Sequence, residues 1–241
     1  GDRGFVGHQA AKMMKRSKML ERRRENAVQE KEKLLKDIES PEPLKINMLH
    51  YHSSSLVTIK DLSVRYPDSD TPLFSGLSME IRSGSRIALS GKNGCGKSSL
   101  IRLILGQNIP HTGEISAASG LRISYVSQDT SQLHGTLSEF ALHCGVDASL
   151  LLTVLDKLGL ERPQFEKRIE TYSEGQKKKV LLAKSLCEPA HLFVWDEPLN
   201  YIDIFSRIQL EDLLLACQPS MLFVEHDRTF REKIATEIIE L

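Results

Sequence analysis

The sequence contains little that points to a secreted, zinc-binding or membrane-spanning protein. Its four cysteines are widely scattered, with no C-x-x-C pair and no histidine arrangement at zinc-ligand spacing. No apolar run approaches the roughly 20 residues that span a bilayer, and the N-terminus has no signal-peptide apolar stretch. We therefore expect a cytoplasmic protein with reduced thiols. Any membrane role would need a separate partner chain.

Net charge is absent as well, because 32 Lys and Arg residues balance 32 Asp and Glu residues. Overall charge thus predicts neither a nucleic-acid nor a membrane partner. The distribution is uneven: residues 1–24 hold eight basic and two acidic residues, whereas residues 25–40 hold three basic and five acidic ones. The candidate phosphate contacts in this basic part are Lys12, Lys15, Arg16, Lys18, Arg22, Arg23 and Arg24.

Residues 1–40 predict one long basic helix, since Gly and Pro are absent between positions 9 and 39. Apolar residues recur there at close to a seven-residue spacing, but Ser17, Arg24 and Lys31 interrupt the seam, so the helix needs a partner helix. Two interpretations stay open. In the first, the segment is a solvent-exposed helix whose charged residues have no specific role. In the second, it is one arm of a helical hairpin whose basic tip binds a polyanion.

After a Pro- and Ser-rich linker at residues 41–55, the chain alternates strand-like and helix-like segments. This alternation predicts an α/β fold with a mostly parallel central sheet. Residues 129–172 are helical only, which predicts an inserted helical subdomain. Strands are expected at 56–60, 77–82, 86–90, 122–127, 191–195, 221–225 and 237–241. Helices are expected at 97–105, 137–144, 148–158, 174–187, 204–216 and 228–235.

A phosphate-binding motif stands between an apolar segment and a predicted helix. The pattern G-x-x-x-x-G-K-[ST] is matched by Gly91, Lys92, Asn93, Gly94, Cys95, Gly96, Lys97 and Ser98, with Ser99 next. Such a loop wraps phosphates with backbone N–H groups, and a helix N-terminus adds favourable charge. Lys97 is expected to reach the β- and γ-phosphates of ATP, and Ser98 to bind Mg²⁺.

Two adjacent carboxylates, Asp196 and Glu197, end the apolar segment 192–195. On its own this pair is usual at the start of a helix or in a loop. Nearly a hundred residues after a phosphate loop, Asp196 is expected to hold Mg²⁺. Glu197 would then orient or deprotonate the attacking water.

Taken together, these segments resemble the ATP-binding cassette (ABC) ATPases over residues 56–241. The resemblance implies a P-loop cassette with a mostly parallel core sheet, an antiparallel β edge and a helical subdomain at about 129–172. It also implies that Tyr66 stacks on adenine, although a strand-end tyrosine more often packs on the core. Gln128 matches the glutamine that touches Mg²⁺ and links to the helical subdomain. His226, after an apolar strand, matches the histidine that senses the γ-phosphate.

Ser173, Glu174, Gly175 and Gln176 match the family's signature loop, which faces the γ-phosphate held by a second cassette. Ser173 and Gln176 also fit a helix capping box. Glu174 replaces a usual glycine and puts a carboxylate near that phosphate, so the opposite site is expected to hydrolyse ATP less strongly. Asn200 and Asp203 match the D-loop, which touches the partner domain. A single cassette is therefore expected to bind ATP but turn it over weakly.

The segment from Glu197 to Asp203 reads E-P-L-N-Y-I-D, which resembles the ABC-F proteins more than the transporters. ABC-F chains carry two cassettes joined by a helical hairpin. The resemblance implies that this chain is a linker arm plus a second cassette, with another cassette upstream or in a homodimer mate. It is closest to the antibiotic-resistance branch that acts on the ribosome, and implies ribosomal or transfer RNA as partner. The alternative is the ATP-binding subunit of a membrane transporter.

Overall fold

The computed structural model describes residues 44–67 and 71–241. The basic segment with the candidate RNA contacts, from Lys12 to Arg24, lies outside the described residues. The strands are β1 (Ser55–Val64), β2 (Phe74–Arg82), β3 (Arg86–Ser90), β4 (His111–Ala117), β5 (Ile123–Val126), β6 (Leu192–Asp196), β7 (Met221–Val224) and β8 (Glu237–Glu240). The helices are α2 (Lys97–Ile104), α3 (Leu137–Cys144), α4 (Ala148–Lys157), α5 (Glu174–Cys187), α6 (Ile204–Cys217) and α7 (Arg228–Ile234).

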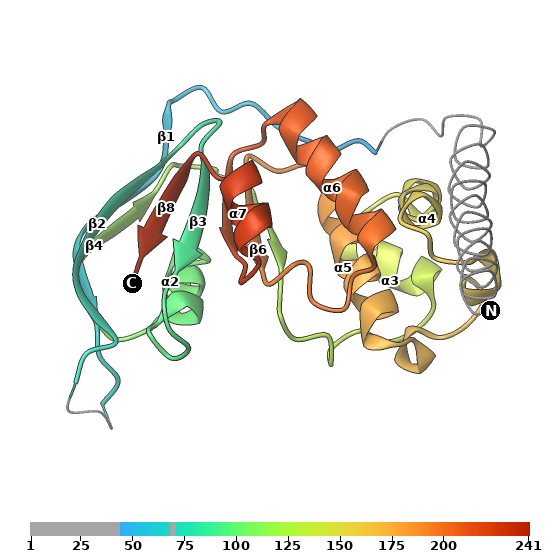
Figure 1. The fold of residues 1–241 in the computed structure, drawn as a ribbon, viewed down its shortest axis with the longest axis horizontal. Helices are drawn as coiled ribbons and strands as arrows, with labels where there is room; N and C mark the ends of the chain where they lie inside the picture. The colour runs from blue at the N-terminus through green and yellow to red at the C-terminus, as the bar shows by residue number, and fades with distance from the viewer. Residues whose placement is uncertain (1–43, 68–70) are drawn as a thin grey trace, which may run out of the picture. The chain divides into compact units, whose positions relative to one another are not determined.

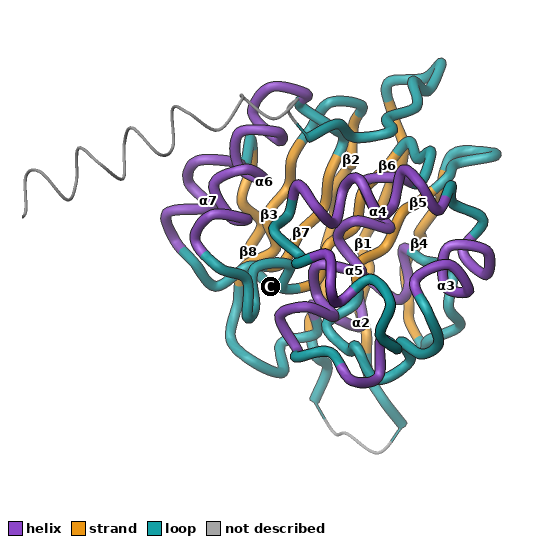
Figure 2. Tube along the Cα trace, turned by 90° about the vertical axis from the view of Figure 1, so that its right-hand side faces the viewer, coloured by secondary structure: helices purple, strands orange, loops and turns teal. Residues whose placement is uncertain are grey.

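Two sheets organise the domain formed by residues 44–241. Five strands pair in the order β5-β6-β7-β3-β8, and every pair in this sheet is parallel. Three strands pair antiparallel in the order β2-β1-β4. Figure 1 shows β1, β2 and β4 at one end of the domain and α3, α4 and α5 at the other, and Figure 2 turns these helices toward the viewer. The expected α/β fold with an antiparallel edge is confirmed.

The parallel sheet separates two hydrophobic cores, because alternate residues of a strand point to opposite faces. In β6, Leu192 and Val194 belong to the core with the antiparallel sheet and α2, whereas Phe193 and Trp195 belong to the core with helices α3 to α7. Trp195 is completely buried, and its Nε1–H donates to Oγ of Ser185 at 2.9 Å. Coverage on both faces explains why β6 and β7, in the middle of the sheet, are completely buried and almost entirely apolar.

The helical region between β5 and α5 consists of α3, α4 and two 3₁₀ turns, Arg162–Gln164 and Ile169–Thr171. Its helices have side-chain caps: Thr136 and Glu139 form a capping box on α3, and Asp147 caps α4. Within residues 44–67 and 71–241, no single helix combines the length and the apolar character needed to cross a membrane. Helices α3 and α4 pass that test only as a pair, and the chain bends by 119° between them.

Strand β4 is absent from the sequence-based expectations. Its side chains are exposed or half-buried throughout, so the apolar alternation that marks a strand is missing. Backbone pairing with β1 fixes it instead, and this pairing is close at Gly113. A Cβ on Gly113, whose φ is +88°, would lie 2.3 Å from the carbonyl oxygen of Asp61. Only glycine allows this approach.

The segment 44–54 precedes β1 and has no regular strand or helix apart from one bridge, between Met48 and Ala190. It is nevertheless attached to the end of α5. The N–H of Asn47 donates to the carbonyl of Leu186 at 3.0 Å, and the N–H of Leu49 donates to that of Ala190 at 2.7 Å. Leu44 is buried in the helical core. The expected linker therefore packs on the domain from its residue 44 onward.

Candidate active site

The loop between β3 and α2 presents backbone N–H groups around a concave turn. Gly94 and Gly96 take positive φ angles of 82° and 106°, which glycine adopts without strain. A Cβ on Gly96 would also lie 2.8 Å from Cδ1 of Phe74. Helix α2 begins at Lys97 without a side-chain cap. Its first N–H groups are therefore available to an anion, as the phosphate-binding motif requires.

Lys97 is held inside this loop. Its Nζ donates to the carbonyl oxygens of Gly91 at 2.9 Å and Lys92 at 3.0 Å, and Sγ of Cys95 lies 3.9 Å away. The side chain is buried, with a positive charge that favours a phosphate at the same place. A Cβ on Gly91 would lie 2.7 Å from Sγ of Cys95, so this turn also needs glycine.

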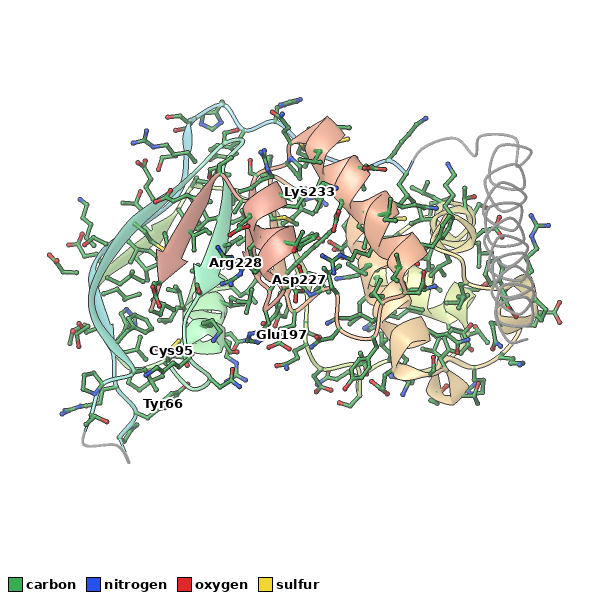
Figure 3. The ribbon with its side chains drawn as sticks, in the orientation of Figure 1. Tyr66, Cys95, Glu197, Asp227, Arg228 and Lys233 are labelled. Atoms are coloured by element: carbon green, nitrogen blue, oxygen red, sulfur yellow. The ribbon has the colours of Figure 1, made fainter. Side chains whose placement is uncertain are left out.

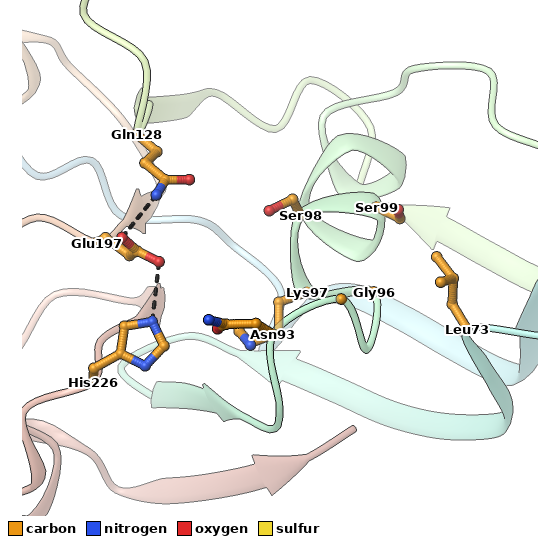
Figure 4. Close-up of a pocket in the computed structure, with 10 residues that line it drawn as sticks. Leu73, Asn93, Gly96, Lys97, Ser98, Ser99, Gln128, Glu197 and His226 are labelled. Atoms are coloured by element: carbon orange, nitrogen blue, oxygen red, sulfur yellow. Dashed lines mark hydrogen bonds and ion pairs between the residues drawn. The ribbon is translucent and has the colours of Figure 1, made fainter.

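Glu197 lies opposite the loop and accepts three side-chain hydrogen bonds. Its Oε2 accepts from Nε2 of Gln128 at 2.9 Å and from Nδ2 of Asn200 at 2.5 Å. Its Oε1 lies 3.1 Å from Nε2 of His226. Figure 4 shows Gln128 and His226 on either side of Glu197. The backbone of Glu197 has a φ of 49°, a conformation that non-glycine residues adopt rarely and often at functional sites.

Asp196 is 5% exposed and lies beneath Glu197 at the end of β6. Burial raises the pKa of its carboxyl group and the charge of Glu197 raises it further, whereas Lys178, Lys97 and Arg102 act in the opposite direction. A divalent cation beside Asp196 would favour the ionised form. Ser98 and Gln128 supply a hydroxyl and an amide oxygen nearby, and oxygen ligands of this kind suit Mg²⁺. The described residues contain no cluster of three His, Cys, Asp or Glu side chains that would suit another metal.

These residues meet at one cleft of about 550 Å³, drawn in Figure 4. The cleft lies at the carboxyl ends of neighbouring parallel strands, which is where ligands bind in open α/β sheets. It is lined by Leu73, Asn93, Gly94, Gly96, Lys97, Ser98, Ser99, Gln128, Glu197 and His226. All of these lining residues except Leu73 are among the nucleotide, metal and catalytic residues predicted from the sequence.

Tyr66 does not line the cleft itself, but it contacts Ser99, which does. Its hydroxyl lies 3.1 Å from Oγ of Ser99, and its ring packs partly buried against the core between the antiparallel sheet and α2. In Figure 3, Tyr66 and Cys95 lie toward the same side of the domain. Leu73, which directly precedes β2, lines the cleft. Adenine stacking by Tyr66 stays a prediction.

The signature residues lie outside this cleft, at the start of α5. Oγ of Ser173 accepts from the N–H of Gln176, and Oε1 of Gln176 accepts from the N–H of Ser173, so the capping box is present. Glu174 accepts from Oγ1 of Thr130 at 2.6 Å and pairs with Lys177 at 3.1 Å; these two contacts lower the pKa of its carboxyl group. A Cβ on Gly175 would lie 2.5 Å from the carbonyl oxygen of Tyr201.

Asp203, which the sequence predicts to be a D-loop residue, makes contacts within its own domain. It caps helix α6 by accepting from the N–H of Ser206 at 2.9 Å, and its Oδ2 lies 2.6 Å from Nζ of Lys179. Although burial alone would raise the pKa of Asp203, the hydrogen bonds from Lys179 and Ser206 lower it to about 2. The carboxylate is therefore ionised at neutral pH and ties α6 to α5.

The sequence-based expectations omit two buried charged residues at the site, Lys178 and Glu225. Lys178 belongs to a run of three lysines, which resembles a solvated surface. One signal was present, since Lys178 stands four residues before Leu182 and seven before Ser185, both on the buried face of α5. Burial lowers the pKa of the Lys178 ammonium, while Asp196, Glu197 and Glu225 raise it.

Comparison with known proteins agrees with this geometry. The family model described as "ABC transporter" matches residues 74–200. ABC transporter F family member 2 of Arabidopsis thaliana is 30% identical over 193 residues, which cover 78% of this chain and 28% of that protein. The ATP-binding protein Uup of Caulobacter vibrioides is 32% identical over 180 residues, 74% of this chain and 29% of that protein. The chain thus spans about a third of these relatives' length.

A solved structure supports the fold independently. The bacterial Atm1-family ABC exporter with ATP bound superposes with a TM-score of 0.68 at 19% identity, and the match covers 81% of this chain and 38% of the exporter chain. At this identity the likeness concerns the arrangement of helices and strands. It agrees with a fold in which a parallel sheet carries a phosphate loop at one edge.

Proposed function

Because the chain belongs to the ABC transporter family, we propose that it binds ATP with Mg²⁺ and hydrolyses the γ-phosphate. The backbone N–H groups of the 91–98 loop and the ammonium of Lys97 would hold the phosphates. Ser98, Gln128 and Asp196 would hold the cation, which supplies charge stabilisation when it is bound. Glu197 would accept a proton from the attacking water and His226 would donate to the phosphate.

One observation carries this proposal: Glu197 lies across the cleft from the phosphate loop with both carboxylate oxygens engaged. Three donors fix its position, and none of them belongs to the phosphate loop. A carboxylate fixed in this way can orient a water molecule without moving away when charge develops at the phosphate. Nucleotide binding and hydrolysis are thus assigned to opposite walls of the same cleft.

The proposal includes a second cassette. Ser173 and its neighbours are not among the described residues that line the cleft of their own domain, so the signature helix at this site would have to come from a second cassette. A partner's signature helix would bring N–H groups and the positive end of its dipole there. We expect the isolated chain to bind ATP but to hydrolyse it weakly. Fast hydrolysis by a preparation shown to be monomeric by light scattering would contradict this expectation.

The proposed whole protein is of the ABC-F type, with this chain as a linker arm and second cassette. Two relatives support this assignment by their names, since Arabidopsis thaliana members 2 and 5 of the ABC transporter F family match at 30% and 29% identity. The basic segment 1–24 adds charge suited to phosphates of RNA. It contains no aromatic residue between positions 6 and 24, which favours backbone contact over base stacking.

The ribosome is the proposed target, in the cytoplasm, and the antibiotic-resistance branch is the proposed subgroup. The test uses the full-length protein with Glu197→Gln, which should hold ATP without hydrolysing it. We expect it to sediment with ribosomes when ATP is present and to stay in the supernatant without nucleotide. Lys97→Met, which weakens ATP binding, is the matched control. If Glu197→Gln stays in the supernatant with ATP, and instead co-fractionates with membranes, the transporter alternative replaces the ribosome.

A further inference from the structure

Glu197 depends on three loops for its position. Gln128 follows β5, Asn200 follows β6, and His226 follows β7. Each of these residues reaches Glu197 from a segment without regular secondary structure. Side chains on such segments hold their geometry only when the backbone beneath them is fixed. Two buried charged residues supply that fixation.

Lys178 fixes the segments that follow β5 and β6. It lies on α5, is 2% exposed, and donates through Nζ to the carbonyl of Ser127 at 2.9 Å and to the carbonyl of Asp196 at 3.2 Å. Ser127 directly precedes Gln128, and Asp196 directly precedes Glu197. One ammonium group therefore joins the backbone of a donor to the backbone of its acceptor.

Glu225 fixes the segments that follow β6 and β7. It is 5% exposed; its Oε2 accepts from the N–H of Leu199 at 3.1 Å, and its Oε1 accepts from the N–H of His226 at 2.9 Å. Leu199 directly precedes Asn200. Both carboxylate oxygens of Glu225 thus accept from backbone N–H groups. One N–H belongs to His226, a donor to Glu197, and the other belongs to the residue before Asn200, another donor.

We infer that Lys178 and Glu225 are positioning residues for Glu197, which hold the backbone at four points from which Glu197 and its three donors extend. Neither side chain contacts Glu197 by a hydrogen bond; each acts through main-chain groups. Burying two charged side chains beneath a site is unfavourable unless they are paired, and here their partners are backbone groups of the site itself. The inference rests on the proposed role of Glu197 in ATP hydrolysis.

If Lys178 and Glu225 only stabilised the fold, their removal would not displace Gln128 and Asn200. The first test therefore measures the positions of these side chains, and the second measures activity. We would record NMR spectra of the 241-residue chain and follow the side-chain NH₂ signals of Gln128 and Asn200. The variant Glu197→Ala defines the signals of these groups without their acceptor. Lys178→Met and Glu225→Gln are the test variants. The controls are Lys184→Met, also on α5 and paired with Glu188, and Glu211→Gln, a buried carboxylate paired with Arg207 and Lys233.

The expected result is that Gln128 signals move toward the Glu197→Ala position in Lys178→Met, and that Asn200 signals do so in Glu225→Gln. At least one of the backbone amides of Leu199 and His226 should also exchange faster in Glu225→Gln, because an amide side chain keeps only one acceptor oxygen. Both controls should leave these signals in place. If the two test variants lower the melting temperature but leave the NH₂ signals and the two amide rates unchanged, the inference is wrong.

Charge and positioning are separated by the double variant Lys178→Met/Glu225→Gln. It restores the charge balance of the wild type but neither set of hydrogen bonds. In single-turnover assays with the paired full-length protein, each single variant should slow hydrolysis about 10- to 100-fold with ATP affinity unchanged. The double variant should be at least as slow. If the double variant recovers the wild-type rate, the two residues act only through their charges and the inference is wrong. If the wild-type protein itself does not hydrolyse ATP, the proposed function is wrong instead.

Discussion

Nε2 of His226 lies 3.1 Å from Oε1 of Glu197, and this contact joins the ends of β7 and β6. Of the two ring nitrogens of His226, Nε2 is the one that faces the carboxylate of Glu197. The histidine side chain is 55% exposed, whereas that of Glu197 is 15% exposed. The imidazole therefore forms an open wall of the cleft while the carboxylate is sheltered behind it.

Glu197→Gln should lower the rate of phosphate release by about 10² to 10⁴, the range expected when a general base is removed. ATP affinity should stay close to that of the wild type, because the phosphate loop is unchanged. Single-turnover hydrolysis and calorimetric titration measure the two quantities separately. Glu237→Gln, an exposed carboxylate on β8, is the control. A Glu197→Gln protein that retains a tenth of the wild-type rate would contradict the assigned role.

Gly96→Ala should weaken ATP binding at least tenfold. The new Cβ would lie 2.8 Å from the Phe74 ring at a φ of +106°, so the turn must shift. Strain at such a position costs on the order of 1–3 kcal/mol. Gly106→Ala is the matched control, since Gly106 has a φ of +81° and no atom within 4 Å of the added Cβ. It should lower stability alone, as thermal unfolding and nucleotide titration would show.

Asp227 should stabilise the fold above about pH 4. A bidentate pair with Arg207, at 2.8 Å for each contact, and the N–H of Phe230 lower the pKa of its carboxyl group from 3.8 to about 2. A depressed folded pKa means that this stabilisation is present above the unfolded pKa and is lost as the pH falls toward 2. Figure 3 shows Asp227 on the helix side of Glu197.

The measurement is the thermal midpoint between pH 7 and pH 2 for the wild type and Asp227→Asn. The variant should be less stable at pH 7, and the two curves should converge near pH 2. Asp212→Asn, an exposed carboxylate on the same helix as Arg207, should follow the wild type throughout. If the thermal midpoints of Asp227→Asn and the wild type differ by the same amount at every pH, the ion pair with Arg207 makes no pH-dependent contribution to stability.

Glu174→Gln should raise hydrolysis by paired cassettes, because a carboxylate at the signature helix opposes the negative charge of the phosphate across the proposed interface. The increase should shrink as salt screens the interaction. Thr130→Val removes the 2.6 Å hydrogen bond to Glu174 without changing charge, and it separates tethering from repulsion. Equal rates for Glu174→Gln and wild type at low salt would show that the carboxylate does not face the phosphate.

Local sequence patterns were enough to predict the phosphate loop and the parallel sheet. Residues 87–89 are apolar and are followed directly by the glycine-rich turn, and the structure has β3 and α2 on either side of it. The alternation of apolar strands and helices likewise predicted β5 to β8 within a few residues. These features depend on neighbours in sequence, which is why a sequence reveals them.

Other features depend on residues far apart in the chain. Strand β4 has few apolar residues and is fixed by its pairing with β1. Lys178 and Ser127 are 51 positions apart, and Glu225 and Leu199 are 26 apart. Nothing in the run of three lysines distinguishes the buried Lys178 from its two half-buried neighbours except its place on the helix. Only the fold brings these partners within hydrogen-bond distance.

Helix α5 connects two places that the sequence separates. Its first residue, Glu174, belongs to the signature loop, and its end is attached to the segment 44–54 through Leu186 and Ala190. Fourteen residues at about 1.5 Å each give a rod of roughly 21 Å. Because an α-helix is stiff along its axis, the signature segment and the segment 44–54 are held at opposite ends of one rigid element.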